Sequence, residues 1–390
     1  MMYFVSSIKN NMYGITDTKD NVEEFYSFNF ILNNFKNIEI KGVFRYQDTI
    51  RIRIYNAESE MLKIQLSGVC SDFDLKIENN KIVASSYNGS SKIVEVPDFI
   101  TKLGDYCFVS CFDLVEIIIP DSVEEIGVGC FSNCDNLKRV KLPNYLTELS
   151  NDCFRSCFSL NHIELPNSLI KLGTGCFTSS GLDNINLPSN LKFIGNFCFS
   201  YCKNLKSVTM YDSVVSLGSK CFSNCIDLRN IRLSDSISSL GSYCFNMCES
   251  IRGIKLPKNL ERIGTNCFNS CTNLSDIVIP DTVYELGKNC FSHCVRLISI
   301  KIPDRVTNLP DCIFYGCNSL EELELSNNLK VIGSNCFSLC YDLRKIDIPD
   351  SVIEIGSSNF DFSGRLHTIK CSNKIYNKLF KVCGSILERR

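Results

Sequence analysis

The sequence predicts a solenoid of parallel β-strands that follows a small N-terminal domain. The first observation behind this prediction is that phenylalanine recurs every 23 residues, with one interval of 22 between Phe177 and Phe199. The second is that every interval carries the same apolar pattern, which is typical of units that bury their apolar faces against one another. The recurring phenylalanines are Phe108, Phe131, Phe154, Phe177, Phe199, Phe222, Phe245, Phe268, Phe291, Phe314, Phe337 and Phe360.

Each repeat reads approximately C-F-x-x-C-x-x-L-x-x-I-x-L-P-x-x-V-x-x-I-G-x-x. Alternating apolar residues before the proline, such as Val140 and Leu142, indicate a short strand with one buried face. The proline lacks an N–H group and ends that strand. A second apolar pair follows, such as Val123 and Ile126, and then a glycine, whose missing Cβ permits a sharp reversal.

The C-F-x-x-C segment predicts a short helical turn, because cysteines at i and i+4 fall on one face of a helix. One repeat cannot bury its apolar residues alone. Stacked repeats can, with strands about 4.8 Å apart in a parallel sheet. The repeats therefore predict one continuous apolar core along that sheet.

The run L-x-x-I-x-L-P-x-x-V-x-x-I-G-x-x-x-F-x-x-C resembles the BspA-type leucine-rich repeat over about residues 91–371. The resemblance implies a leucine-rich-repeat solenoid, a parallel β-sheet with short helical turns, that acts as a binding module. Several members of this family are assigned as surface adhesins, and others have no assigned role. This chain departs from the family pattern because cysteine, in place of alanine, mostly precedes the phenylalanine.

Residues 1–90 lack the repeat and predict a small α+β domain that also caps the solenoid. A helix is expected over 22–35, where apolar residues have roughly helical spacing. Asn79 and Asn80 separate two apolar runs, which is a hairpin signal. Strands are expected over 12–17, 38–40, 49–55 and 61–66.

Residues 372–390 predict a C-terminal capping helix, with apolar residues such as Ile375, Leu379 and Ile386 on one face. Terminal repeats of a solenoid need such covers, and capping is favoured over a helix that binds a partner. The expected domains are therefore 1–90, 91–371 and 372–390.

Composition argues against several classes of function. The chain has 390 residues and a formal net charge of −2, so no nucleic acid is expected as a partner. No run of about eighteen apolar residues occurs, so no membrane-spanning helix is expected. The start MMYFVSSIKNN lacks the layout of a signal peptide, which predicts a cytoplasmic protein. Export to the cell surface by a non-standard route is the alternative.

The 24 cysteines mostly occupy two columns of the repeat. The first cysteine column lies directly before the phenylalanine, as Cys221 does, and the second lies three residues after it, as Cys225 does. Three interpretations stay open: buried free thiols, disulfides and structural zinc. Serine replaces the second column at Ser180 and Ser363, which favours small buried residues. Stacked Cβ vectors do not converge as disulfides require, and the pairs lack the convergence of a zinc site.

No catalytic residues, metal ligands or cofactor are expected. His162, His293 and His367 lie in different repeats, and nothing in the pattern brings them to a common nucleophile. No Walker-type loop, G-x-S-x-G or H-E-x-x-H motif occurs.

The strand residue between the two inward positions faces outward and changes freely from repeat to repeat. Such variation is typical of a binding surface, and equally of any solvated face. In this column Arg232 and Lys255, with Arg229 and Arg252 beside them, form a basic patch across two strands. We expect this patch to attract an acidic partner.

Tyrosines outside the core pattern lie in the same repeats. They are Tyr201, Tyr211 and Tyr243, and tyrosine is frequent at interface hot spots. An acidic cluster lies further along, at residues 321–324.

These observations favour a non-enzymatic, protein-binding solenoid that recognises a macromolecular partner through its strand face. Two alternatives stay open. One is an extracellular or cell-surface adhesin, and the other is an effector or enzyme whose activity lies in residues 1–90. The oligomeric state is left open.

Deleting one whole repeat, residues 244–266, should leave a soluble, folded protein, because each unit contacts only its neighbours. Deleting eleven residues from the same place, 244–254, should abolish folding, because the strand of one repeat would then meet the turn of the next. Circular dichroism and solubility measure both outcomes, and equal damage from the two deletions would contradict the solenoid.

Overall fold

The structure is a computed structural model. It describes the side chains of residues 72–74, 81–98, 100–373, 375–377 and 379, and the strand backbone of 2–9, 12–17, 23–27, 38–40, 51–56, 62–67, 75–78 and 387–389. The chain forms two compact units, Met1–Cys157 and Phe158–Arg390.

Strands dominate the described part of residues 1–90. The helix expected over 22–35 is wrong where the structure describes it, because Glu23–Ser27 form β3, which pairs antiparallel with β2. The remainder of that helix lies outside the described residues. The turn expected at Asn79 and Asn80 lies outside the described residues, but the flanking strands β7 and β8 pair antiparallel, with Ile77 opposite Ile82. The strands are β1 Met2–Lys9, β2 Met12–Asp17, β3 Glu23–Ser27, β4 Ile38–Ile40, β5 Arg51–Asn56, β6 Leu62–Ser67, β7 Phe73–Glu78 and β8 Lys81–Tyr87.

The N-terminal sheet continues directly into the solenoid of the first unit. Strand β8 pairs in parallel with β10, which places Val83 opposite Lys102, and β10 pairs in parallel with β12. The ring of Tyr87 stacks on Phe108 at 4.8 Å between centroids. Phe73 and Tyr87 therefore cover the first recurring phenylalanine. The other strands of the first unit are β9 Ile93–Glu95, β10 Lys102–Leu103, β11 Glu116–Ile118, β12 Glu125–Ile126, β13 Arg139–Lys141 and β14 Glu148–Leu149.

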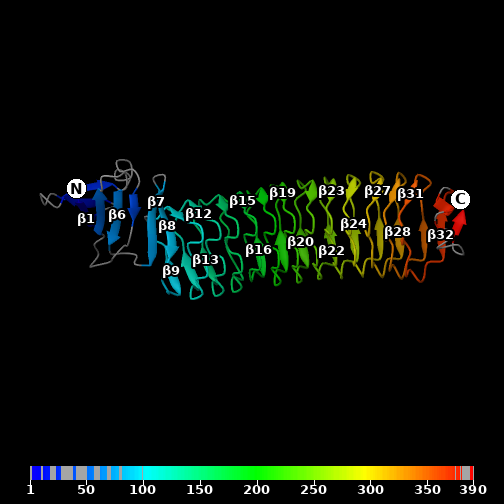
Figure 1. Cartoon of the computed structure of the whole chain (residues 1–390), viewed down its shortest axis with the longest axis horizontal. Helices are drawn as coiled ribbons and strands as arrows, with labels where there is room; N and C mark the ends of the chain where they lie inside the picture. The colour runs from blue at the N-terminus through cyan, green and yellow to red at the C-terminus, as the bar shows by residue number, and fades with distance from the viewer. Residues whose placement is uncertain are drawn as a thin grey trace. The chain divides into compact units, whose positions relative to one another are not determined.

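The second unit has two ladders of parallel strands, which Figure 1 shows as two rows of arrows. The first ladder consists of β16 Asn184–Asn186, β18 Ser207–Thr209, β20 Asn230–Arg232, β22 Gly253–Lys255, β24 Asp276–Val278, β26 Ser299–Lys301, β28 Glu322–Glu324, β30 Lys345–Asp347 and β32 Thr368–Cys371. The second consists of β15 Lys171–Leu172, β17 Phe193–Ile194, β19 Ser216–Leu217, β21 Ser239–Leu240, β23 Arg262–Ile263, β25 Glu285–Leu286, β27 Asn308–Leu309, β29 Val331–Ile332 and β31 Glu354–Ile355.

The register of the first ladder matches the repeat. Ile185 lies opposite Val208, and Val208 lies opposite Ile231, so equivalent residues of successive repeats are neighbours. The middle residue of these strands generally points into the core and its two neighbours point outward. We call the outward side of this ladder the strand face.

The recurring phenylalanines form the spine of the core. In the second unit their rings stack from Phe177 to Phe360, with neighbouring centroids 5.3–6.3 Å apart and ring planes within 19°. In the first unit Phe108, Phe131 and Phe154 stack at 5.2 Å. All of these rings are fully buried except Phe360, which is 9% exposed.

The short helical turns expected at C-F-x-x-C are wrong. The residues two positions before and two positions after each recurring phenylalanine have φ between +52° and +72°, so the segment is a series of tight turns. The N–H groups of these residues and of the phenylalanine donate to the next repeat, as Lys220, Phe222 and Asn224 do to residues 242, 244 and 246. This left-handed backbone costs a non-glycine residue about 1–2 kcal/mol.

Glycine is required where successive repeats approach most closely. A Cβ at Gly218 would lie 2.4 Å from the backbone nitrogen of Asn196. The N–H group of Gly218 donates to the carbonyl of Ile194 in the preceding repeat. Glycine is therefore required here mainly because successive repeats are in close contact, and less because the chain reverses its direction.

The second cysteine column has a definite hydrogen-bonding role. The thiol of Cys225 donates to the carbonyl of Phe199 at 3.1 Å, and the same contact recurs at 3.0–3.2 Å along both units. Ser363 makes the equivalent contact with its hydroxyl, which donates to Phe337 at 2.9 Å. A small side chain with a donor is what this position needs, so serine can replace cysteine there.

The described cysteines are free thiols, and all but Cys111 and Cys312 are buried. The interpretation as small core residues is thus confirmed for the buried ones. Burial raises the pKa of Cys202 to about 11 and the pKa values of Cys157 and Cys244 to about 12. These thiols are protonated at neutral pH and carry no nucleophilic thiolate.

The C-terminal segment is helical at Asn373, 375–377 and Leu379, and Ile375 and Leu379 are buried. The capping helix expected over 372–390 does not extend to the end of the chain. Leu387–Arg389 form β33, which pairs in parallel with β32 and places Leu387 opposite Ile369.

Replacing Phe222 by alanine should lower the free energy of unfolding by about 3–5 kcal/mol, because it removes a fully buried ring from the stack. The matched control is Phe360→Ala, where the ring is partly exposed near the end of the array, and a much smaller loss is expected. Chemical denaturation of both variants measures the difference, and a mild effect at Phe222 would contradict the stack as the spine of the core.

The buried thiols should make stability fall in alkaline solution. The folded pKa values of thiols such as Cys157, Cys202 and Cys244 lie above the unfolded value of about 8.5, so the unfolded state loses protons first as pH rises. Each thiol should therefore contribute its full stabilisation below about pH 8.5 and lose about 1.4 kcal/mol per pH unit from there towards its folded pKa.

Thermal unfolding between pH 7 and pH 11 measures this loss. Alkylation at pH 7.5 is the control: among the described cysteines Cys111 and Cys312 should react first, and the buried thiols only after denaturation without reductant. Paired cysteines in the mass spectrum would contradict the free-thiol core.

Candidate functional site

The basic patch lies on the strand face of the second unit. Arg232 on β20 is paired in register with Lys255 on β22. Arg229 and Arg252 precede these two strands, and all four side chains are exposed. None of the four makes an ion pair with any residue that the structure describes. Four cations therefore face solvent on two adjacent strands.

The acidic residues near the patch form no ion pair with its four cations among the described residues, although Asp235 interacts electrostatically with Lys255. Asp227 and Glu249 lie in the turns that precede β20 and β22. Neither forms an ion pair within the described part of the chain. Asp235 beyond β20 pairs with Lys258 at 3.6 Å, and the pKa of Asp235 is lowered first by the hydrogen bond from the Lys258 backbone N–H.

Gly253 leaves an opening within the patch. It occupies an outward strand position, and its φ does not lie in the left-handed region. A Cβ there would meet the carbonyl oxygen of Asp276 at 3.4 Å, an ordinary contact. Neither conformation nor packing requires glycine at this point, where it leaves the backbone of β22 accessible.

The structure separates the three candidate tyrosines. Tyr211 follows β18 by two residues and is 47% exposed. Tyr201 and Tyr243 lie instead among the left-handed turns, with φ of +60° and +59°. They therefore belong to the row of C-F-x-x-C turns, which we call the turn edge, and only Tyr211 adjoins the strand face.

At the turn edge the side chain of Lys220 lies between two aromatic rings. The sequence analysis did not predict this arrangement. The ammonium group of Lys220 lies 5.2 Å from the ring centroid of Phe197 and 4.9 Å from that of Tyr243. These three residues occupy the same position in successive repeats, two residues before the recurring phenylalanine. The signal was available in the sequence, because other repeats place glycine or asparagine there, as at Gly175 and Asn266.

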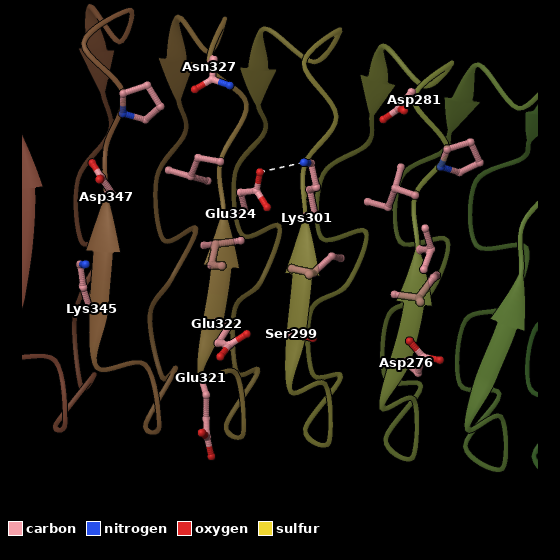
Figure 2. Close-up of a pocket in the computed structure, with 18 residues that line it drawn as sticks. Asp276, Asp281, Ser299, Lys301, Glu321, Glu322, Glu324, Asn327, Lys345 and Asp347 are labelled. Carbon is pink, nitrogen blue, oxygen red and sulfur yellow. Dashed lines mark ion pairs between the residues drawn. The ribbon is translucent and has the colours of Figure 1, made fainter.

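An open depression of about 910 Å³ lies further along the strand face, over β24, β26, β28 and β30. Figure 2 shows Lys301 pointing toward Glu324, with which it forms an ion pair at 2.8 Å. The hydrogen bond that Lys301 donates to Glu324 raises the pKa of Lys301. Glu321 and Glu322 of the acidic cluster line the same depression, and Val278 at its margin is 75% exposed.

Two of the three histidines make local contacts on the solenoid. His293 packs edge-on against Tyr315 at 5.3 Å, and Nδ1 of His367 lies 3.0 Å from the Thr368 hydroxyl. Among the described residues no group of three histidine, cysteine or acidic side chains is placed to hold a metal ion. No described helix is long and apolar enough to cross a membrane.

The similarity of this chain to known proteins lies mainly in its repeats. A family model described as BspA type leucine rich repeat region matches residues 65–183, 171–298 and 262–387. No curated protein sequence matches the chain at a significant level.

Two solved bacterial structures are similar in fold. A leucine-rich repeat protein from Bacteroides ovatus shares 22% identity, with a TM-score of 0.63 over 83% of this chain and 99% of the other. A leucine rich cell surface protein from Faecalibacterium prausnitzii also shares 22% identity, with a TM-score of 0.51 over 82% of this chain and 94% of the other.

Proposed function

Because this chain belongs to the BspA-type leucine-rich repeat family, we propose that it is a non-enzymatic binding protein. It holds an acidic protein partner on the strand face of its second unit, over the basic patch. The observation that carries the proposal is the set of four exposed cations, Arg229, Arg232, Arg252 and Lys255, without ion-pair partners among the described residues.

The positive charges of the basic patch are unfavourable for the stability of the folded chain. Arg232 and Lys255 are directly opposite each other on adjacent strands, where like charges are destabilising. The repeat does not require them, because the same outward column holds Thr209 on β18 and Val278 on β24. An acidic partner would relieve this repulsion, which gives the patch a favourable role in the complex.

The chemistry of the patch suits carboxylates. Arginine presents a planar fork of N–H donors that binds both oxygens of a carboxylate. Gly253 lies on β22 between Arg252 and Lys255 and leaves the backbone open for close approach. Complementary charge acts mainly on the association rate and on the choice of partner.

The location proposed for this protein is the cytoplasm, where a reducing environment keeps buried thiols free. A cell-surface adhesin is the second candidate, because the similar Faecalibacterium prausnitzii structure is of a cell surface protein. Fractionation of the native host distinguishes the two: recovery of the chain on intact, protease-accessible cells would favour the adhesin.

Arg232→Glu with Lys255→Glu should weaken capture of the native partner at least tenfold, about 1.4 kcal/mol. The melting temperature should remain nearly unchanged, because both side chains are exposed. Partners cross-linked in extracts of the host are identified by mass spectrometry and then titrated against the purified chain.

The matched control is Arg262→Glu with Lys330→Glu. It changes the net charge equally but alters exposed residues outside the strand face, in β23 and directly before β29. Capture that is unchanged in the first double variant, or equally weakened in both, would remove the strand face from the proposal.

A further inference from the structure

Three consecutive repeats place large side chains where the backbone disfavours them. The left-handed positions of the turn edge mostly hold glycine, asparagine, aspartate or serine, which tolerate that conformation best. Between Phe197 and Met247 five of them hold large residues instead. We call these five residues the turn-edge patch: Phe197, Tyr201, Lys220, Tyr243 and Met247.

Burial does not explain these residues. Phe197 is 41% exposed, Tyr201 is 50% exposed and Met247 is 42% exposed, whereas the apolar residues of the core are almost fully buried. Elsewhere large residues at left-handed positions are fewer, at most one in a repeat, as at Leu339 and Phe362. The three repeats therefore combine an unfavourable backbone conformation with apolar surface that remains in water.

Contacts within the chain account for part of the arrangement. Lys220 lies over the rings of Phe197 and Tyr243, and these cation–π contacts hold both rings in place. Tyr201 and Met247 have no such contact among the described residues. Rigid aromatic side chains of this kind, with methionine beside them, are enriched in the cores of protein interfaces.

The turn-edge patch continues into the basic patch around one short bend of the chain. Tyr201 is followed by the exposed residues Lys203 and Lys206, and the carbonyl of Lys206 accepts the N–H of Arg229. Lys220 forms no ion pair with a described residue, and the acids at this bend are Asp227 and Glu249. Apolar anchors thus adjoin an excess of positive charge.

We propose that the turn-edge patch is the apolar anchor site for an acidic protein segment. The segment carries aromatic or aliphatic side chains that pack on Tyr201 and on Met247, which flank Asn224 two repeats apart, with carboxylates beside them that meet Lys220 and the basic patch. This inference rests on the proposed function for its charged half, and its apolar half is independent of the strand face.

A protein segment fits the patch better than single-stranded nucleic acid, which also uses aromatic and basic residues. Bases stack on open ring faces, and Lys220 already covers one face of Phe197 and one of Tyr243. Methionine at 247 offers no ring to a base.

Random twelve-residue peptides displayed on phage and selected on the full chain test the ligand class. The expected result is enrichment of aspartate or glutamate next to phenylalanine, tyrosine or leucine. Enrichment of acidic peptides without apolar residues, or of none, would overturn the proposal. So would binding of oligouridylate or heparin at concentrations where the selected peptides do not bind.

Tyr201→Asn with Met247→Asn tests the anchor directly. Asparagine is favoured in left-handed backbone, so the melting temperature should stay equal or rise by about 2 °C, while the selected peptide binds at least tenfold more weakly. Phe362→Asn is the matched control, since Phe362 is exposed at the same position of another repeat. It should leave peptide binding unchanged.

The outcomes separate this inference from the proposed function. A melting temperature that falls by several degrees in the first variant would show that its side chains serve the fold, and would overturn the anchor. Retained capture of the host partner by Tyr201→Asn with Met247→Asn, together with loss in Arg232→Glu with Lys255→Glu, would overturn the anchor alone. Retained capture in both variants would overturn both proposals.

Discussion

The close spacing of successive repeats is the constraint on which the rest of the structure depends. Parallel strands lie about 4.8 Å apart, and the phenylalanine rings between them must stack with that spacing. Their centroids are 5.2–6.3 Å apart within the two units, and the ring planes are nearly parallel. A side chain of another shape would separate the strands, so the same residue returns in each repeat. Glycine at positions such as Gly218 follows from the same spacing, because no Cβ fits between the repeats.

The cysteines are explained by this spacing and by hydrogen bonding together. A residue beside the stacked rings must be small, and the carbonyl of each phenylalanine lies within reach of a side chain in the next repeat. The thiol at Cys225 fills the space and donates to the carbonyl of Phe199. Ser363 does the same with an oxygen, which shows that the donor matters as well as the size. Cysteine therefore recurs because each repeat needs a small side chain with a hydrogen-bond donor at this position.

Function on such a scaffold is sought where the repeats differ from one another. The stack fixes the inward positions, and the outward positions of the strand face and the turn edge are free to vary. Two departures lie in the same three repeats: the unpaired cations around Gly253 and the large side chains at left-handed positions around Lys220. Both are unfavourable for the isolated chain, through charge repulsion in one case and backbone conformation in the other. A bound partner gives the two departures a common explanation.

The sequence by itself determined the period, the strands of the repeats, the buried phenylalanine and cysteine columns and the outward position of Arg232 and Lys255. These follow from local alternation and from the need of each repeat to bury its apolar residues. The tertiary structure decided the conformation of C-F-x-x-C, because the N–H groups of the phenylalanine and of the left-handed residues find their acceptors in the next repeat and not within a helix. It also made a strand of Glu23–Ser27, whose partner β2 lies elsewhere in the chain, and moved Tyr201 and Tyr243 to the turn edge. Hydrogen-bond partners supplied by neighbouring segments cannot be read from local spacing, and that is where prediction from the sequence ended.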